Sequence, residues 1–534
     1  SNNTAMGSNS LYANTTGTGN VAVGSGALDA NTTASYNTAI GQSALGANTI
    51  GGENTAVGYS ALGANVSGDR STAMGYNALA AQNNGTLTYD ADNTAFGFHA
   101  AVSITTGLRN IAIGSSALGL ADADGRNVAI GYSALSNMNT ASSTPYNVAV
   151  GYSAGASVTT GVNNTLIGGL AGDAITTATD SVALGYLALT STTTGIRNHA
   201  IGRQSLHNNT TGADNVGVGS SSLFANTTGF YNVAVGTDAL VTNTTASNNT
   251  AVGYAALKLN TTGTNNTAIG MQSLLAVTTA SSNTGVGKNS LANTTTGASN
   301  VAVGHNALLT NTTAGNNTAL GFEALKANTT GDLNVSLGAS SMLDNTTGSR
   351  NVALGAYVLT NNTTASFNTG VGDSSLGANT TGASNTAVGE GSLDANTTAD
   401  NNTAVGRDAL GANTTGDLNT AVGKSAGAAN TTGVRNTFVG AGVAASNTTG
   451  NYNTGVGGQG SDNYNVLNNN ISGSQLAAFG VGTLTRNTTG DYNTAIGNYA
   501  LKANTTASNN TAVGWGALTA NTTGTENTSV GDSS

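Results

Sequence analysis

The chain repeats a short phrase at a fixed interval, and this repetition limits its possible folds more than any other feature. The phrase is typified by NTAVG, and the glycines that close its first copies, Gly7, Gly24 and Gly41, lie 17 residues apart. The chain holds 31 such phrases up to Gly531, and 27 of the 30 intervals between them are 17 residues long. The other three intervals are 22, 20 and 23 residues. Such a short, regular period is typical of a solenoid, in which each repeat forms one coil.

The length of the repeat distinguishes between strands and helices. Helical solenoids need roughly 33 to 47 residues per repeat and leucine-rich repeats about 20 to 29, so 17 residues leave room only for short strands and turns. Pieces such as TAV favour a strand, the A-L-x-A that follows predicts a second extended piece, and N-T-T-G is typical of a turn. We therefore predict an all-β fold, a parallel β-solenoid (β-roll) of about 31 stacked 17-residue coils.

These coils are expected to form one continuous repeat rod over residues 1–534. Strands of neighbouring coils pair at about 4.8 Å, which gives a rod on the order of 150 Å long. Hereafter position 1 is the asparagine that opens the phrase, and position 5 is the glycine that closes it.

The side chains are sorted by position, which a disordered chain has no reason to maintain. Position 4 is apolar in all 31 phrases, and positions 2 to 4 hold no Asp, Glu, Lys or Arg. Of the 14 basic residues, 13 fall at positions 6, 10 and 17. We expect the position-4 column, for example Val252, to be buried and position 6, for example Thr237, to be exposed. Position 3 is small, with Leu166 and Phe438 as the clear exceptions, and this small face is compatible with close approach of copies.

Asparagine recurs at positions 1 and 12 of nearly every coil. Identical amides stacked at strand spacing can hydrogen-bond to one another, so both columns predict amide ladders. An alternative for the N-T-T phrase at position 12 is N-glycosylation of its asparagine.

The phrase N-T-A-V-G-x-x-A-L-x-A resembles the head repeats of trimeric autotransporter adhesins, and it is similar to the Asn-Thr-Gly-rich repeats of tail-fibre-like proteins of phages and bacteria. The resemblance covers the whole chain and implies a left-handed β-roll, a homotrimer and a place outside the cell, on a cell surface or a virion. The departures are a longer repeat and the lack of a recognisable membrane anchor, heptad stalk or self-cleaving chaperone module.

Several classes of partner are disfavoured by composition. A net charge of −10 argues against nucleic acid, and no apolar run predicts membrane insertion. The chain begins and stops in phase with the repeat and shows no polar cap. Because open solenoid ends template further pairing, we expect either a segment of a longer protein or end-to-end self-association.

The sequence offers little chemistry. Its four histidines fall at four different positions of the phrase, and it has no cysteine. DADGR at 122–126 and YDADN at 89–93 resemble the start of calcium loops but lack the downstream glutamate. We therefore expect no enzymatic activity, no catalytic residue, no metal site and no cofactor.

Two features could carry recognition of a cell-surface glycan or protein receptor. One is the set of aromatic residues at position 6, which could stack on sugars or could only pack over the glycines of neighbouring coils. The other is the set of insertions at 76–92, 132–146 and 458–478, where the period is broken. The candidate binding residues from both features are Tyr59, Tyr76, Phe98, Tyr132, Tyr152, Tyr89, Tyr146 and Tyr464.

The sequence thus favours a non-enzymatic extracellular fibre segment, an adhesin head or shaft or a phage tail fibre, that attaches to a cell surface. One alternative is a structural filament of copies stacked end to end. Another is an ice-binding solenoid, although the adjacent threonines of N-T-T point to opposite faces and leave one threonine column on each.

Overall fold

The computed structural model describes residues 2–83, 85, 90–140, 144–458 and 464–534. These residues contain one three-residue strand for each of the 31 phrases, every pair of strands is parallel, and no helix occurs among them. The parallel β-solenoid of about 31 coils is confirmed. The chain divides into two compact units, Ser1–Asn265 and Asn266–Ser534, and each is described by itself. Handedness and trimerisation stay predictions, as does the single continuous rod.

The strands of the first unit are β1 (Thr4–Met6), β2 (Val21–Val23), β3 (Thr38–Ile40), β4 (Thr55–Val57), β5 (Thr72–Met74), β6 (Thr94–Phe96), β7 (Ile111–Ile113), β8 (Val128–Ile130), β9 (Val148–Val150), β10 (Thr165–Ile167), β11 (Val182–Leu184), β12 (His199–Ile201), β13 (Val216–Val218), β14 (Val233–Val235) and β15 (Thr250–Val252). Those of the second unit are β16 (Thr267–Ile269), β17 (Thr284–Val286), β18 (Val301–Val303), β19 (Thr318–Leu320), β20 (Val335–Leu337), β21 (Val352–Leu354), β22 (Thr369–Val371), β23 (Thr386–Val388), β24 (Thr403–Val405), β25 (Thr420–Val422), β26 (Thr437–Val439), β27 (Thr454–Val456), β28 (Ala477–Phe479), β29 (Thr494–Ile496), β30 (Thr511–Val513) and β31 (Thr528–Val530).

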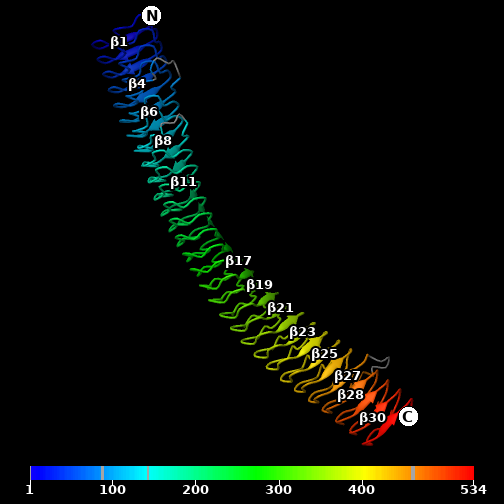
Figure 1. Cartoon of the computed structure of the whole chain (residues 1–534). Helices are drawn as coiled ribbons and strands as arrows, with labels where there is room; N and C mark the ends of the chain where they lie inside the picture. Colours follow the sequence, from blue (N-terminus) through cyan, green and yellow to red (C-terminus); the bar gives the residue numbers. More distant parts are fainter. Residues whose placement is uncertain (1, 84, 86–89, 141–143, 459–463) are drawn as a thin grey trace. The chain divides into compact units, whose positions relative to one another are not determined.

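Within each unit, consecutive strands lie side by side, so that each coil contacts the coils before and after it (Figure 1). The register places equivalent residues opposite each other, as where Val233, Ala234 and Val235 of β14 face Thr250, Ala251 and Val252 of β15. Identical positions therefore form columns along the coils. The neighbours of a residue are its own equivalents, which is why the phrase has to repeat.

The prediction that position 4 is buried is wrong. In β14 the position-3 residue Ala234 is completely buried, whereas Val233 and Val235 are only half-buried, and Val252 is half-buried as well. Successive side chains of a strand point to opposite faces, so position 3 points inward while positions 2 and 4 point outward. The small position-3 face therefore lies inside each coil and cannot serve the approach of another copy. The exposure of Thr237 is as expected.

The two large exceptions at position 3 confirm the inward direction. Leu166 and Phe438 are both completely buried. Glycine replaces the usual leucine at position 9 beside each of them, and a Cβ atom there would lie 2.7 Å from Leu166 at Gly155 and 2.8 Å from Phe438 at Gly427. The core thus holds a fixed volume, which is filled either from position 9 or from position 3.

The A-L-x-A piece is a turn, so the prediction of a second extended piece there is also wrong. Its leucine at position 9 is completely buried and has a left-handed backbone, with φ of 52° at Leu28 and 50° at Leu45. This conformation is costly for a bulky residue. It persists because each of these leucines donates its backbone N–H to a carbonyl of the next coil, as Leu28 does to Ala44 at 3.1 Å.

The amide ladders are confirmed at both asparagine columns. At position 12, Asn48 Nδ2 donates to Asn31 Oδ1 of the preceding coil at 3.1 Å. At position 1, Asn37 accepts the backbone N–H of Asn54 through its Oδ1 at 2.9 Å. Both columns converge on position 15, where the Gly51 carbonyl accepts from Asn37 at 2.8 Å and from Asn48 at 2.9 Å.

The ladder also corrects the N-glycosylation alternative. Asn345 opens an N-T-T phrase and is completely buried, and its Nδ2 donates to Asn328 and to the Gly348 carbonyl at 2.9 and 3.0 Å. A glycan has to be attached to that nitrogen atom. Coils with such a buried asparagine at position 12 therefore offer no acceptor there.

Candidate functional site

The outward face of the strands is the most extensive unusual surface of the molecule. We call it the strand face, and it consists of the position-2 and position-4 side chains of each unit. Position 4 is large and partly exposed, with Phe96 at 54%, Ile113 at 37% and Ile269 at 41%. Position 2 is Thr or Val in most coils. Soluble monomers rarely expose large contiguous apolar patches, so the partly exposed apolar column at position 4 makes this face a candidate interaction surface.

Charges border the strand face on both sides but do not enter it. The basic residues at position 6 follow the strand, as Arg203 follows β12, and those at position 17 precede it, as Arg197 does. Among Asp, Glu, Lys, Arg and His, only His199 lies on the face itself. An apolar centre with a polar rim is the usual anatomy of a protein interface.

The candidate aromatic residues of position 6 stack on one another. Tyr59 and Tyr76 have ring centroids 5.0 Å apart and nearly parallel planes, and Tyr76 and Phe98 follow at 5.4 Å. Tyr132 and Tyr152 form a separate stack at 5.4 Å. Stacked rings cover each other's faces, and a sugar would have only their edges and the outer faces of the terminal rings. This arrangement favours a packing role for these five residues.

The other three candidates lie at the insertions. Tyr146 is held beneath the Arg126 guanidinium, which lies 5.7 Å from its ring centroid. Tyr464 lies beneath the ammonium group of Lys502, at 3.9 Å. Tyr89 lies outside the described residues. Within the first unit, the six described candidates are therefore divided between two ring stacks and the Arg126–Tyr146 contact and do not form one site.

The insertions leave most of their coil intact. Register and hydrogen bonds put the extra residues of the first two between positions 12 and 17, after Gln82 and after Met138, and those of the third directly after Gly457. The second is anchored by Asp124, a completely buried carboxylate that accepts the backbone N–H of Thr140 at 2.9 Å and also its hydroxyl.

All six arginines of position 17 have partners in the same column of a neighbouring coil. Arg197 forms two hydrogen bonds with Asp214 at 2.6 and 2.9 Å, and these bonds lower the pKa of Asp214 and raise that of Arg197. The remaining five form ion pairs or lie over aromatic rings, in the pairs Arg70–Asp92, Arg109–Asp92, Arg126–Tyr146, Arg350–Phe367 and Arg435–Tyr452. Sequence reasoning missed these pairs, although comparison of position 17 between adjacent coils would have found them.

The acidic motifs are occupied by such internal contacts. Asp90 and Asp92 both pair with Arg70, and Asp122 accepts the hydroxyl of Thr105. No group of three or more His, Asp or Glu residues that could hold a metal occurs in the part of the chain that the structure describes.

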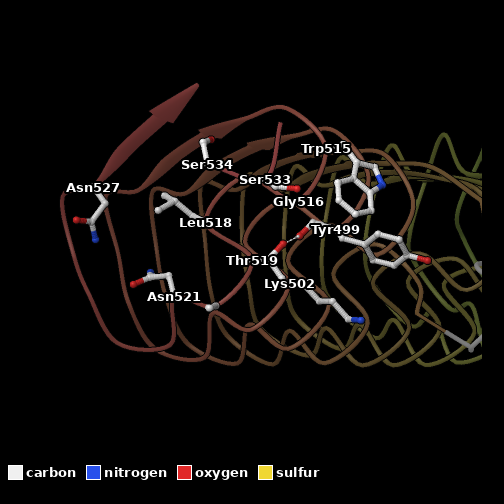
Figure 2. A pocket seen from close by; sticks show the side chains of 11 residues that line it. Tyr499, Lys502, Trp515, Gly516, Leu518, Thr519, Asn521, Asn527, Ser533 and Ser534 are labelled. Atoms are coloured by element: carbon white, nitrogen blue, oxygen red, sulfur yellow. Dashed lines mark hydrogen bonds between the residues drawn. The ribbon is translucent and has the colours of Figure 1, made fainter. Parts of the chain in front are cut away.

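A hollow of about 830 Å³ lies at the last coils of the chain. Figure 2 shows Leu518, Asn521 and Asn527 in one half of it, and Tyr499, Lys502 and Trp515 on the opposite flank. In the preceding coil the equivalents of the first three residues, Leu501, Asn504 and Asn510, are completely buried. We therefore assign no ligand to that half of the hollow.

Comparison with known proteins adds no family. No protein-family model matches the chain, and no curated protein does. Among the residues that the structure describes, no helix is long and apolar enough to span a membrane.

Proposed function

We propose that this chain is a non-enzymatic, extracellular fibre segment, part of an adhesin or a phage tail fibre, that attaches to a cell surface and assembles with its own copies through the strand face. The observation that carries this proposal is the strand face itself, which combines an apolar, partly exposed column at position 4 with mostly threonine or valine at position 2 in the coils of both units and has charges only at its borders. Burying such a surface is the main driving force of association.

A second copy of the chain is the partner that best fits the face. The face repeats once per coil, so only a partner with a similar long periodic surface could cover it. Another copy of the chain necessarily carries the same surface. Closed symmetric assemblies of identical chains are also the commonest oligomers. The resemblance to adhesin head repeats makes three copies our proposed stoichiometry.

The test replaces three outward residues of neighbouring coils, Val388→Lys, Val405→Lys and Val422→Lys, in one variant. The expected result is a monomer by light scattering with an unchanged circular dichroism spectrum, and loss of binding to cells that the parent binds. The matched control places three lysines at the exposed position 14 of the same three coils, as Thr398→Lys, Thr415→Lys and Thr432→Lys. If the parent is itself monomeric, or if the strand-face variant assembles like the parent, the proposal is wrong.

End-to-end association into a filament is the second candidate, because each coil pairs with its neighbours through the same parallel register, which another copy could continue. Electron microscopy of the parent distinguishes fixed-length rods from growing filaments.

The ice-binding alternative is weakened by the threonines of N-T-T. The position-13 hydroxyl donates to a carbonyl of the next coil, as Thr329 does to Thr346 at 2.9 Å, and only the position-14 column is exposed. A thermal-hysteresis assay tests it.

A further inference from the structure

The flank of the hollow holds a cluster of aromatic rings around one cation, which we call the Lys502 cluster: Tyr464, Tyr499, Lys502 and Trp515. The ammonium group of Lys502 lies 3.9 Å from the ring centroid of Tyr464 and 4.8 Å from that of Tyr499. Trp515, the only tryptophan of the chain, stands perpendicular to Tyr499 at 6.4 Å between centroids. The cluster joins residues from three coils and includes Tyr464, which lies within the third insertion.

A glycine makes this arrangement possible. Gly482 occupies position 7, which in other coils is a serine such as Ser43 or Ser60 with the same left-handed backbone. A Cβ atom at Gly482 would lie 2.6 Å from the ring of Tyr499 and 3.6 Å from Cβ of Tyr464. Because it has no side chain, the Tyr499 ring can lie across this position toward Tyr464. Lys502 can then contact both rings.

The tryptophan of this cluster differs from the stacked tyrosines of the first unit. Trp515 is 56% exposed, much as the stacked Tyr132 and Tyr152 are at 54% and 60%, but its contact with Tyr499 is edge-to-face rather than face-to-face. An edge-to-face contact leaves open ring surface, whereas Tyr76 is covered on both sides by Tyr59 and Phe98. An open indole surface can pack against the C–H groups of a sugar ring, because the aromatic face carries negative charge density and is easily desolvated.

The cation supplies the second requirement of a ligand site. Lys258 and Lys326 pair with Asp238 and Glu323, but no Asp or Glu among the described residues forms an ion pair with Lys502. Among the described residues, this charge is met only by the π-faces of Tyr464 and Tyr499, which attract a cation less strongly than a carboxylate does. A ligand carboxylate could therefore replace water at this ammonium group.

We propose that the Lys502 cluster binds a carboxylate-bearing sugar, with the sugar ring against Trp515 and its carboxylate on Lys502. The inference rests on the proposed attachment function, for which it names the ligand class. Hydrophobic surface combined with a few placed polar groups is the usual composition of a small-ligand site.

The single tryptophan makes the test direct. N-Acetylneuraminic acid and glucuronic acid are titrated against the full chain while the fluorescence of Trp515 is recorded, with glucose as the neutral probe. We expect a saturable change with at least one of the two acidic sugars and none with glucose over the same range. We expect Lys502→Met to weaken binding at least tenfold and Lys502→Arg to preserve it. Lys326→Met, at the same position of another coil, is the matched control.

Gly482→Ser tests the architecture of the cluster, because serine is ordinary at position 7 and should displace only the Tyr499 ring. It should weaken binding while circular dichroism is unchanged. The proposal is overturned if neither acidic sugar gives a response, if glucose gives an equal one, or if Lys502→Met binds like the parent. Repeating the titration on the monomeric strand-face variant separates this proposal from the proposed function, because the cluster needs no second copy.

Discussion

The inward and outward sides of one strand are both apolar, yet only one of them forms the core. In β14, Ala234 is completely buried while the larger Val235 remains half-exposed. The reason lies across the coil, where the alanine at position 8 and the leucine at position 9, Ala239 and Leu240, already fill the interior. Side-chain volume, rather than hydrophobicity, therefore selects the inward side of this strand, and the more hydrophobic column is left for other contacts.

The largest effect should come from a charge on the inward side. We expect Ala234→Asp to destabilise the surrounding coils by roughly 3–5 kcal/mol, because an unpaired carboxylate would be buried. Denaturant unfolding of a monomeric background, together with hydrogen exchange of the neighbouring coils, measures it.

The outward side provides the comparison in the same coil. Val235→Asp and the position-6 change Thr237→Asp should cost less than about 1 kcal/mol in the monomer, because both side chains reach solvent. Val235→Asp should nevertheless weaken assembly, and Thr237→Asp much less. Equal destabilisation by Ala234→Asp and Val235→Asp would refute the assignment of the two sides.

The next effect concerns the shared volume of positions 3 and 9. Phe438→Ala should cost about 3 kcal/mol by leaving a cavity, and Gly427→Leu should be destabilising because its Cβ atom would lie 2.8 Å from Phe438. The double variant restores the alanine and leucine that most coils have. We expect it to be markedly more stable than the sum of the single changes predicts, and strict additivity in a double-mutant cycle would contradict a shared volume.

A smaller effect is expected in the amide ladder. Asn226 donates to Asn209 at 2.8 Å and accepts from Asn243 at 2.9 Å. Asn226→Leu should cost about 2 kcal/mol, because buried polar partners lose their bonds. The reverse change, Val158→Asn, introduces an asparagine at position 12 of a coil whose next neighbour has an apolar residue, Ile175, at the same position. It should not stabilise the chain, and thermal unfolding of both variants checks whether the ladder acts as a unit.

The smallest effects are those of pH on two carboxylates, Asp214 and Asp394. The pKa of Asp214 is lowered by its hydrogen bonds to Arg197, so its contribution is present above the pKa of the unfolded chain and is lost as pH falls through the folded value. The pKa of Asp394 is raised by partial burial and by the charge of Asp373, so this group favours folding at low pH and opposes it as pH rises. NMR titration of the two carboxylates checks the directions. At neutral pH, Asp214→Asn should slightly destabilise and Asp394→Asn slightly stabilise; the opposite order would contradict the pairings.

The period and its columns made the coil, its parallel register and the amide ladders predictable. The inward direction was missed because Ala and Val are both acceptable in a core, and alternation alone cannot choose between them. The sequence does contain the deciding signal, since Leu166 and Phe438 coincide with glycines at position 9. The left-handed leucines could not be predicted from local preference, because only bonds to the next coil stabilise them.

The candidate site was harder to predict than the fold. The aromatic residues were found by type, but whether a ring is open or covered depends on which residues flank it in neighbouring coils. Lys502 contacts Tyr464 because Gly482 of the coil between them has no side chain. A contact between separate coils of this kind has no short sequence motif that would predict it. Trp515 also stands at position 6 but is not among the eight binding candidates, since its edge-to-face contact is visible only in three dimensions.

The glycine column at position 5 limits how this gene can vary. A Cβ atom on Gly236 would lie 2.5 Å from the Gly253 carbonyl oxygen, and the backbone there has φ of 134°, so any other residue collides with the next coil. Every mutation that replaces such a glycine is therefore destabilising, whereas substitutions at positions such as 6 and 16 are tolerated. The recurrence of glycine at position 5 is consequently maintained by steric selection. It does not measure how recently the coils were duplicated.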